Sequence, residues 1–225
     1  MKHHFIITIV LLCISVSFIG CGDSPTSPKR AKIVYVAMGA SDAVGIGAFP
    51  LENGYVYRVR DGLKKRARNV YLYNLGVPGI RIGFIKDTEL PVAITCKPDV
   101  VTIWAGANDI VRGDSAEKFE NSLEKILSRL SQKTTAFIVI ANIPDLTELP
   151  SFQANPDSDV TSERIAAYNA AIARQAAAYN VSVVDLFSGE YASDWMYVSI
   201  DGFHPSNEGH AKLAKLYLDI ILDYF

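Results

Sequence analysis

The sequence predicts one α/β domain in three layers, an α/β/α sandwich with helices on both faces of a five-stranded parallel sheet. Two observations indicate this fold. Five apolar runs rich in β-branched residues follow one another along the chain, and amphipathic helix-like segments lie between them. A length of 225 residues with 49% hydrophobic residues also suits one substantial core, and no internal repeat interrupts the pattern.

The first 20 residues have the pattern of a secretory signal peptide. Lys2 precedes the uncharged run FIITIVLLCISVSFI (5–19), and Gly20 stands before Cys21. The run is shorter than the roughly 20 residues that a comfortable membrane span needs. Its end, FIGC, resembles the lipobox of bacterial lipoproteins, although Phe18 stands where Leu or Val is usual. This resemblance implies cleavage before Cys21 and lipidation of its thiol.

We therefore expect an exported lipoprotein, anchored by lipid to a membrane of the cell envelope. An ordinary signal peptide cut nearby, giving a secreted or periplasmic protein, and an uncleaved anchor are the alternatives. Residues 21–31 contain the small, polar, proline-bearing stretch GDSPTSPKR and are expected to form a flexible tether before a domain at 32–225. Once the leader is removed, only Cys21 and Cys96 remain of three cysteines. If Cys21 carries lipid, Cys96 has no intramolecular partner, so no disulfide framework is expected.

Five segments are expected to form the strands. They are KIVYVAM (32–38), VYLYNL (70–75), DVVTIWA (99–105), AFIVIAN (136–142) and VSVVDL (181–186). Continuous apolar runs of this kind are typical of strands buried on both faces of a parallel sheet.

Three helices stand out between and after these strands because their apolar residues recur at spacings of three and four. They are expected within 115–133, 161–180 and 209–225. The formal net charge is −2, so charge provides no argument for nucleic-acid binding.

In open parallel sheets, ligands bind beyond the carboxyl ends of the strands. Polar and glycine-rich stretches follow the first three strands as GASDAVGIG, GVPG and GAND, and DGFHP precedes the last helix. The first stretch places Ser41 at a strand-to-helix turn, where its hydroxyl is exposed near a helix N-terminus. Taken alone, Ser41 or Asp42 is as well explained as a cap of that helix.

The next two stretches offer hydrogen-bond donors. We expect Gly76 to adopt a positive φ in a turn, and Gly79 either to do the same or to present its N–H to a developing oxyanion. Asn108 brings an amide donor into the same cleft or caps a helix, and Asp109 is assigned to the helix cap.

The last stretch, DGFHPSNEGH (201–210), contains both histidines that remain after the leader. Pro205 keeps His204 extended and suits the first turn of the following helix. Asp201 lies three residues earlier, where its carboxylate can accept a hydrogen bond from the imidazole. His210 shares a helix face with Leu213, so we expect it to pack against the core.

In combination, these residues resemble the four signature blocks of the SGNH-hydrolase (GDSL esterase/lipase) superfamily, in the order that the family has. The blocks are Gly39-Ala40-Ser41, Gly79, Gly106-x-Asn108 and Asp201-x-x-His204. The resemblance implies a flavodoxin-like fold with Ser41 as nucleophile, His204 as base and acid, and Asp201 orienting it. It also implies an oxyanion hole made by the N–H groups of Ser41 and Gly79 and the side chain of Asn108. Ala40 departs from the usual aspartate before the serine.

The hypothesis is therefore a serine ester hydrolase that needs no metal or organic cofactor and acts on a small-molecule, lipid or acylated-carbohydrate ester. An acyltransferase or a carbohydrate O-deacetylase would use the same residues. Two rival hypotheses are a non-catalytic ligand-binding lipoprotein, for which Ala40 argues, and a metal hydrolase built on Asp42, Asp109, Asp201 and His204. Long loops at 144–159 and 187–200 carry apolar side chains expected to wall an acyl pocket: Phe152, Tyr191, Trp195, Met196 and Tyr197. The sequence predicts neither the oligomeric state nor the acyl chain length.

Overall fold

The structure, a computed structural model, describes residues 29–225. The predicted signal peptide and Cys21 lie outside this range. Within it, none of the helices combines the length and the apolar character that a membrane span requires.

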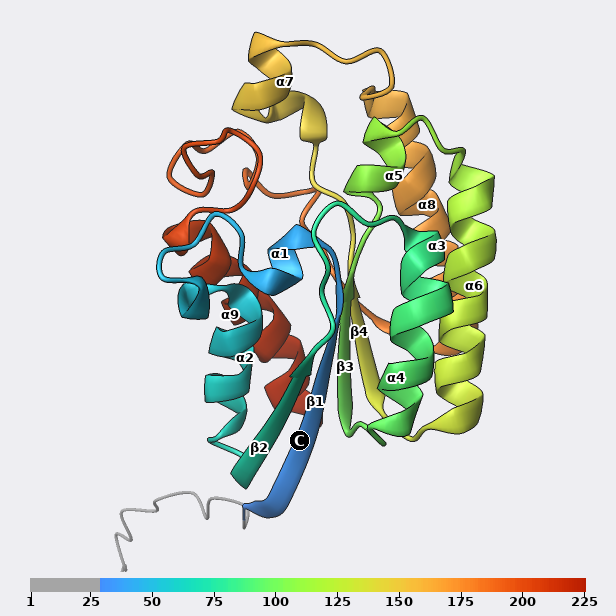
Figure 1. The fold of residues 1–225 in the computed structure, drawn as a ribbon, viewed down its shortest axis with the longest axis vertical. Helices are drawn as coiled ribbons and strands as arrows, with labels where there is room; N and C mark the ends of the chain where they lie inside the picture. The colour runs from blue at the N-terminus through green and yellow to red at the C-terminus, as the bar shows by residue number, and fades with distance from the viewer. Residues whose placement is uncertain (1–28) are drawn as a thin grey trace, which may run out of the picture.

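The centre of the domain is a five-stranded parallel sheet with the strand order β2-β1-β3-β4-β5 (Figure 1). Its strands are β1 (Arg30–Gly39), β2 (Ala67–Asn74), β3 (Val100–Trp104), β4 (Phe137–Ala141) and β5 (Ser182–Val184). All five lie in the predicted apolar runs or overlap them, and the predicted fold class is confirmed. β1 begins at Arg30, which pairs with Ala67, so the last two residues of the predicted tether lie in the sheet.

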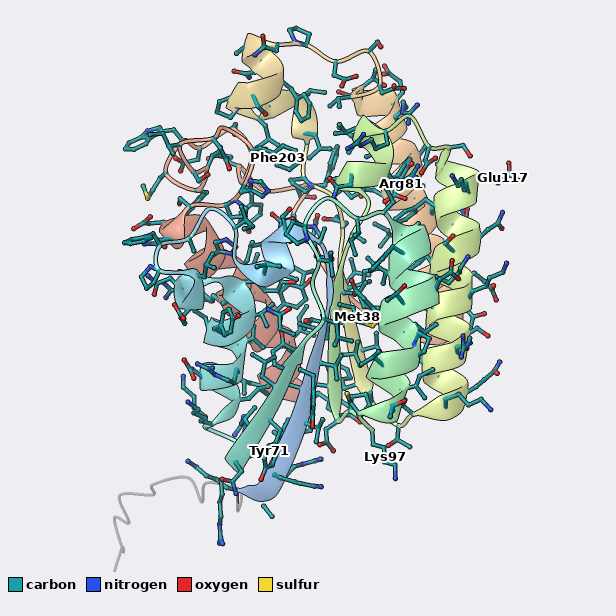
Figure 2. All side chains as sticks on the ribbon, viewed as in Figure 1. Met38, Tyr71, Arg81, Lys97, Glu117 and Phe203 are labelled. Atoms are coloured by element: carbon teal, nitrogen blue, oxygen red, sulfur yellow. The ribbon has the colours of Figure 1, made fainter. Side chains whose placement is uncertain are left out.

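β1 is the central strand, and its sequence explains why both faces of the sheet are covered. Successive side chains of a strand point to opposite faces. Tyr35 and Ala37 pack into the core on one face, and Val36 and Met38 pack into the core on the other. Figure 2 shows Met38 between the sheet and the helices.

The prediction of burial on both faces is wrong for β2. This strand lies at the edge of the sheet, and its residues alternate between exposed and partly covered positions, with Tyr71 and Tyr73 exposed. A run that contains tyrosines can alternate in burial because their rings combine an apolar body with a polar tip. The apolar pattern of the run therefore did not reveal its place at the edge.

Helices cover the two faces unequally. On one face lie α2 (Tyr55–Leu63) and α9 (Asn207–Tyr224), and on the other lie α4 (Leu90–Thr95), α6 (Ala116–Lys133) and α8 (Ser162–Tyr179) (Figure 1). The three predicted helices correspond to α6, α8 and α9. The shorter helical segments are α1 (Ser41–Val44), η1 (Leu51–Asn53), α3 (Ile82–Phe84), η2 (Ile85–Glu89), α5 (Ala107–Val111), η3 (Leu146–Glu148) and α7 (Pro150–Ala154).

α6 shows how the sequence sets a helix boundary. Ser115 precedes its first turn, and its Oγ accepts a hydrogen bond from the N–H of Lys118 at 3.2 Å. Phe119, Leu123 and Leu127 then share the buried face. α8 begins in the same way, with the Oγ1 of Thr161 accepting from the N–H of Arg164.

Candidate active site

Ser41 follows the carboxyl end of β1 and is the first residue of α1. The strand ends at Gly39, whose φ is +154°, and a Cβ at this position would lie 2.6 Å from the carbonyl oxygen of Trp104. Only glycine fits a backbone that passes so close to its neighbour. The turn brings Ser41 to the carboxyl ends of the strands, where it is 5% exposed.

The structure brings Ser41, His204 and Asp201 into one chain of hydrogen bonds. The Oγ of Ser41 lies 3.0 Å from the Nε2 of His204, although 163 positions separate the two residues in the sequence. On the other side of the ring, Nδ1 lies 2.6 Å from the Oδ2 of Asp201. An ionised carboxylate has no proton to donate, so the proton between Asp201 and His204 belongs to Nδ1. Nε2 is then free to accept from the serine hydroxyl.

Asp201 is held in its ionised form by several donors. Its Oδ1 accepts hydrogen bonds from the hydroxyl of Ser199 at 2.7 Å and from the N–H groups of Phe203 and His204. Burial opposes the charge, but these bonds and the bond from the imidazole of His204 keep the pKa of Asp201 well below its usual value. The carboxylate is therefore a fixed negative charge behind the histidine.

The backbone around His204 is tied to the preceding loop. The N–H of Ser199 donates to the carbonyl of His204 at 2.8 Å, and Val198 forms an antiparallel bridge with Pro205. The prediction that Pro205 lies in the first helical turn is wrong. α9 begins at Asn207, and Ser206 is its cap, because its side chain accepts from the N–H of Gly209.

Of the two predicted oxyanion donors beyond Ser41, one lies in the loop after β2 and the other in α5. Gly79 has a φ of +74°, and a Cβ there would meet nothing within 4 Å, so its backbone borders open space. Asn108 lies in α5, and its Nδ2 donates one hydrogen bond to the carbonyl of Ile80 at 2.9 Å. An amide group has two N–H bonds, so one remains for a ligand.

The prediction that Asp109 caps its own helix is wrong, because its carboxylate binds the start of a different helix. It is the third residue of α5 and 1% exposed, and both carboxylate oxygens accept from the N–H of Ile82, the first residue of α3. Burial raises the pKa of Asp109 to about 6. This contact joins α5 to the loop that carries Gly79, and a sequence pattern offers no sign of a bond between segments so far apart.

Two glycines shape these loops by close approach. The prediction of a positive φ at Gly76 is wrong: a Cβ at this position would instead lie 2.7 Å from the Cβ of Ala43. Gly106 has a φ of +117°, and a Cβ there would lie 2.5 Å from the Cδ1 of Ile143. The positive φ favours glycine at 106 in the β3–α5 turn that presents Asn108, and an added Cβ would also displace the end of the Ile143 side chain.

His210 is fully buried, and both of its ring nitrogens are hydrogen-bonded. Nδ1 accepts from the N–H of Tyr55 at 3.2 Å, so Nε2 carries the proton that it shares with the carbonyl of Ile46 at 3.0 Å. The ring also stacks against the side chain of Tyr55. Burial lowers the pKa of His210 to about 4. The expectation that this histidine packs in the core is confirmed.

A cavity of about 50 Å³ lies beside His204. Its walls are mostly apolar and come from the carboxyl ends of the strands and from the loops above them. They include Trp104, Leu146, Leu149, Leu186, Val198 and Phe203. Asp42 adds a half-buried carboxyl group to the wall, and burial raises its pKa to about 6 against the opposing effect of His204.

The predicted aromatic wall is right for only some of its members. Tyr191 and Tyr197 line the cavity, but Phe152, Trp195 and Met196 do not. Phe152 packs edge-to-face on Phe203, one residue before His204, and Trp195 is 80% exposed. Figure 2 shows Phe203 at the end of the domain where these loops gather.

Among residues 29–225, no three His, Cys, Asp or Glu side chains are grouped so that they could hold a metal ion. The four residues of the hypothetical metal hydrolase have different contacts. Asp201 and His204 bind each other, Asp109 binds the N–H of Ile82, and Asp42 faces the cavity.

Known proteins resemble this chain in sequence and in fold. The model of the GDSL-like lipase/acylhydrolase family matches residues 24–212. The spore germination lipase LipC of Bacillus licheniformis is 22% identical over 204 residues, which cover 80% of this chain and 92% of the relative.

Solved structures share the fold. The lipase/acylhydrolase from Enterococcus faecalis superposes with a TM-score of 0.69 at 23% identity and covers 84% of this chain and 95% of its own. A mutant of the acetyl-xylooligosaccharide esterase Axe2 from Geobacillus superposes with a TM-score of 0.68 at 21% identity and covers 84% of this chain and 94% of its own.

Proposed function

The chain belongs to the GDSL-like lipase/acylhydrolase family and is a carboxylic ester hydrolase, and we propose that it works through an acyl-enzyme on Ser41. In this proposal His204 is the general base and then the general acid, and Asp201 orients it. The observation that carries the assignment is the continuous chain from the Oγ of Ser41 through His204 to Asp201, with distances of 3.0 and 2.6 Å.

In the acylation step, the Oγ of Ser41 attacks the ester carbonyl carbon while its proton passes to the Nε2 of His204. The carbonyl π electrons move to the oxygen and form a tetrahedral oxyanion. When this intermediate collapses, the bond to the alcohol oxygen breaks, and His204 returns the proton to the leaving alcohol. Asp201 stabilises the imidazolium that exists between these two proton transfers.

Deacylation repeats the sequence with water as the nucleophile. Water gives a proton to the Nε2 of His204 and adds to the acyl carbon, and the carboxylic acid leaves as Ser41 regains its proton. The oxyanion is stabilised by the N–H groups of Ser41 and Gly79 and by the Nδ2 of Asn108. Ser41 is the first residue of α1, so its N–H has no partner within the helix.

A short acyl group is the substrate that the cavity favours. The apolar cavity beside His204, with a volume of about 50 Å³, supports a short acyl group as the part of the substrate that it holds. The likeness to an acetyl-xylooligosaccharide esterase supports carbohydrate O-deacetylation as a second candidate with the same residues. Hydrolysis and transfer to a sugar hydroxyl would differ only in the nucleophile of the second step.

The test compares the full-length protein with Ser41→Ala on p-nitrophenyl esters from acetate to palmitate, on acetylated xylooligosaccharides, and with a fluorophosphonate probe. We expect hydrolysis of acetyl and butyryl esters, labelling of the wild type, and a loss of kcat of about a thousandfold or more in the variant. Ser128→Ala, on α6, is the matched control and should keep wild-type activity. Equal rates for Ser41→Ala and wild type would refute the proposal.

Localisation is a separate proposal, supported by the first 21 residues of the sequence. We propose that the leader is removed before Cys21 and that the lipidated cysteine tethers the domain to a membrane of the cell envelope.

A further inference from the structure

A buried glutamate lies behind the turn that carries the nucleophile. Glu89 is 3% exposed and is the last residue of η2, a short π-helical segment. π-helical turns are rare and often occur at functional sites, because the extra residue in the turn redirects a side chain. Ile85 of this segment and Leu90, which follows it, belong to the apolar core.

The carboxyl group of Glu89 reaches the end of the central strand. Its Oε2 accepts a hydrogen bond from the N–H of Gly39 at 3.0 Å. The carbonyl of Gly39 accepts from the N–H of Val77 at 3.2 Å. Both polar groups of the last residue of β1 are thus held by segments on either side of it, two positions before Ser41.

Ala40 stands where the family usually has aspartate, so this position offers the turn no polar side chain. It is 6% exposed and contributes a methyl group only. The carboxyl group that contacts the nucleophile turn through its backbone is that of Glu89, supplied from η2.

The surroundings of Glu89 favour its uncharged form. Its Oε1 is buried and has no hydrogen-bond partner, donor or acceptor, among the described residues, so no donor there stabilises a carboxylate. Lys86 and Asp87 of the same segment pair with each other at 3.3 Å. Burial raises the pKa of the Tyr55 phenol in α2 well above its usual value, and the charges of Tyr217, Tyr35, Asp42 and, least of all, Glu89 add to this effect. Burial raises the pKa of Glu89 to about 8, against the opposing effect of the hydrogen bond from the N–H of Gly39.

We propose that Glu89 is a positioning residue, which holds the β1–α1 turn through the N–H of Gly39 and does so as a neutral carboxylic acid. The inference rests on the proposed role of Ser41. A carboxylate here would be a buried, unpaired charge behind the site where the oxyanion develops, so ionisation would oppose both the packing and the reaction.

The test uses two variants of the full-length protein. Glu89→Gln keeps an oxygen acceptor but cannot ionise. Glu89→Leu removes the acceptor and puts an apolar side chain of similar size in its place. At pH 7 we expect Glu89→Gln to stay within about threefold of wild-type kcat. Glu89→Leu should lose about 10- to 100-fold in kcat with little change in KM, since a shifted turn misplaces the nucleophile.

The pH profile separates positioning from general stability. Between pH 7 and 9.5, wild-type kcat should decline as Glu89 ionises, and Glu89→Gln should lack this decline. The control is Glu117→Gln on the outer surface of α6, which should follow the wild type (Figure 2). All rates are corrected for spontaneous ester hydrolysis.

Two results would overturn the inference: wild-type kcat in Glu89→Leu, or the same alkaline decline in Glu89→Gln as in wild type. If Glu89→Leu does not fold, the profile of Glu89→Gln decides alone. Fluorophosphonate labelling of Ser41 in each variant separates failure of the positioning role from failure of the proposed function. A wild type that labels at Ser41, with Glu89 variants that behave like it, refutes the positioning role only.

Discussion

The two histidines of the described chain have the same side chain and opposite environments. His204 lies at the edge of the sheet with an ionised carboxylate on one nitrogen and a serine hydroxyl on the other. His210 lies in the core with a backbone N–H on one nitrogen and a backbone carbonyl on the other. A carboxylate partner stabilises the imidazolium, whereas the two backbone partners match the neutral ring.

We expect the corresponding variants to separate activity from stability. His204→Ala should lose about a thousandfold or more in kcat and unfold like the wild type, because the ring is at the surface of the site. His210→Ala should keep most of its kcat when folded but lose about 2–4 kcal/mol of unfolding free energy, because it leaves backbone groups unpaired in the core. Ester hydrolysis and urea unfolding at pH 7 measure the two effects. Full turnover in His204→Ala would contradict the assignment.

The pH dependence of unfolding provides a second readout for His210. Its pKa falls from 6.5 in the unfolded chain to about 4 in the folded protein. Above pH 6.5 His210 is neutral in both states, so its protonation does not change the free energy of unfolding. Between pH 6.5 and 4 the unfolded state binds a proton on this ring that the folded state does not bind. Stability is therefore lost as the pH falls, by up to about 3 kcal/mol. His210→Ala should show a correspondingly smaller loss over this range than the wild type.

At the scale of elements, the site depends on strand-to-helix turns that the backbone can make only with glycine. The β3–α5 turn is the clearest case, because Gly106 has a φ of +117° and an added Cβ would have to displace the end of the Ile143 side chain. This turn sets the position of Asn108, the proposed oxyanion donor, and of Asp109, which accepts from the N–H of Ile82 at the start of α3.

We predict that Gly106→Ala lowers kcat/KM by about 10-fold or more and destabilises the fold by about 1–3 kcal/mol, through strain and overpacking. Gly83→Ala is the matched control, since Gly83 lies in α3 with nothing within 4 Å of an added Cβ. That variant should keep its activity. Steady-state kinetics and thermal unfolding of the pair check the prediction, and an equal response of both variants would contradict it.

At the scale of the whole molecule, the chain enters the domain far from the site. β1 runs from Arg30 at one end of the sheet to Gly39 at the other, a rise of about 33 Å for ten residues. Ser41 follows at the carboxyl ends of the strands, and the chain enters at their amino ends, as Figure 1 shows. A tether that begins at Cys21 would therefore attach on the side of the domain opposite the site.

From this arrangement we predict that anchoring and catalysis are separable. Cys21→Ala should move the protein from the membrane fraction to the soluble fraction of the expressing bacterium, with kcat on a soluble ester within about twofold of wild type. Cys96→Ala, at the end of α4, is the control for loss of a thiol and should stay with the membrane. Ultracentrifugation and activity in each fraction measure the outcome. Wild-type protein found in the soluble fraction would argue against the anchor.

Much of the fold could be predicted from the sequence because its signals are local and repeated. The apolar runs at 32–38 and 99–105 have the composition of buried parallel strands, and the spacing of Phe119, Leu123 and Leu127 is that of a helix face. The candidate site could be located for a related reason. Parallel strands gather their carboxyl ends at one edge, so polar residues after each run are expected to meet there.

The remaining features depend on contacts between distant segments, to which a single sequence offers no guide. Whether a tyrosine-bearing run is central or at an edge depends on which strands pair, and Tyr71 proved to be exposed. Asp109 has the spacing of a helix cap but binds another helix. Glu89, in an acidic and polar stretch, gave no sign that it would be buried against Gly39.

By itself, then, the sequence determined the α/β class, the order of its elements and the short polar blocks that follow the strands, since each of these is written in neighbouring residues. Only the tertiary structure decided which side chains are hydrogen-bonded to one another and which are buried. Ser41 meets His204 across 163 positions, and Glu89 meets the turn behind that serine. Burial and distance set hydrogen bonding and pKa, and both exist only once the chain has folded.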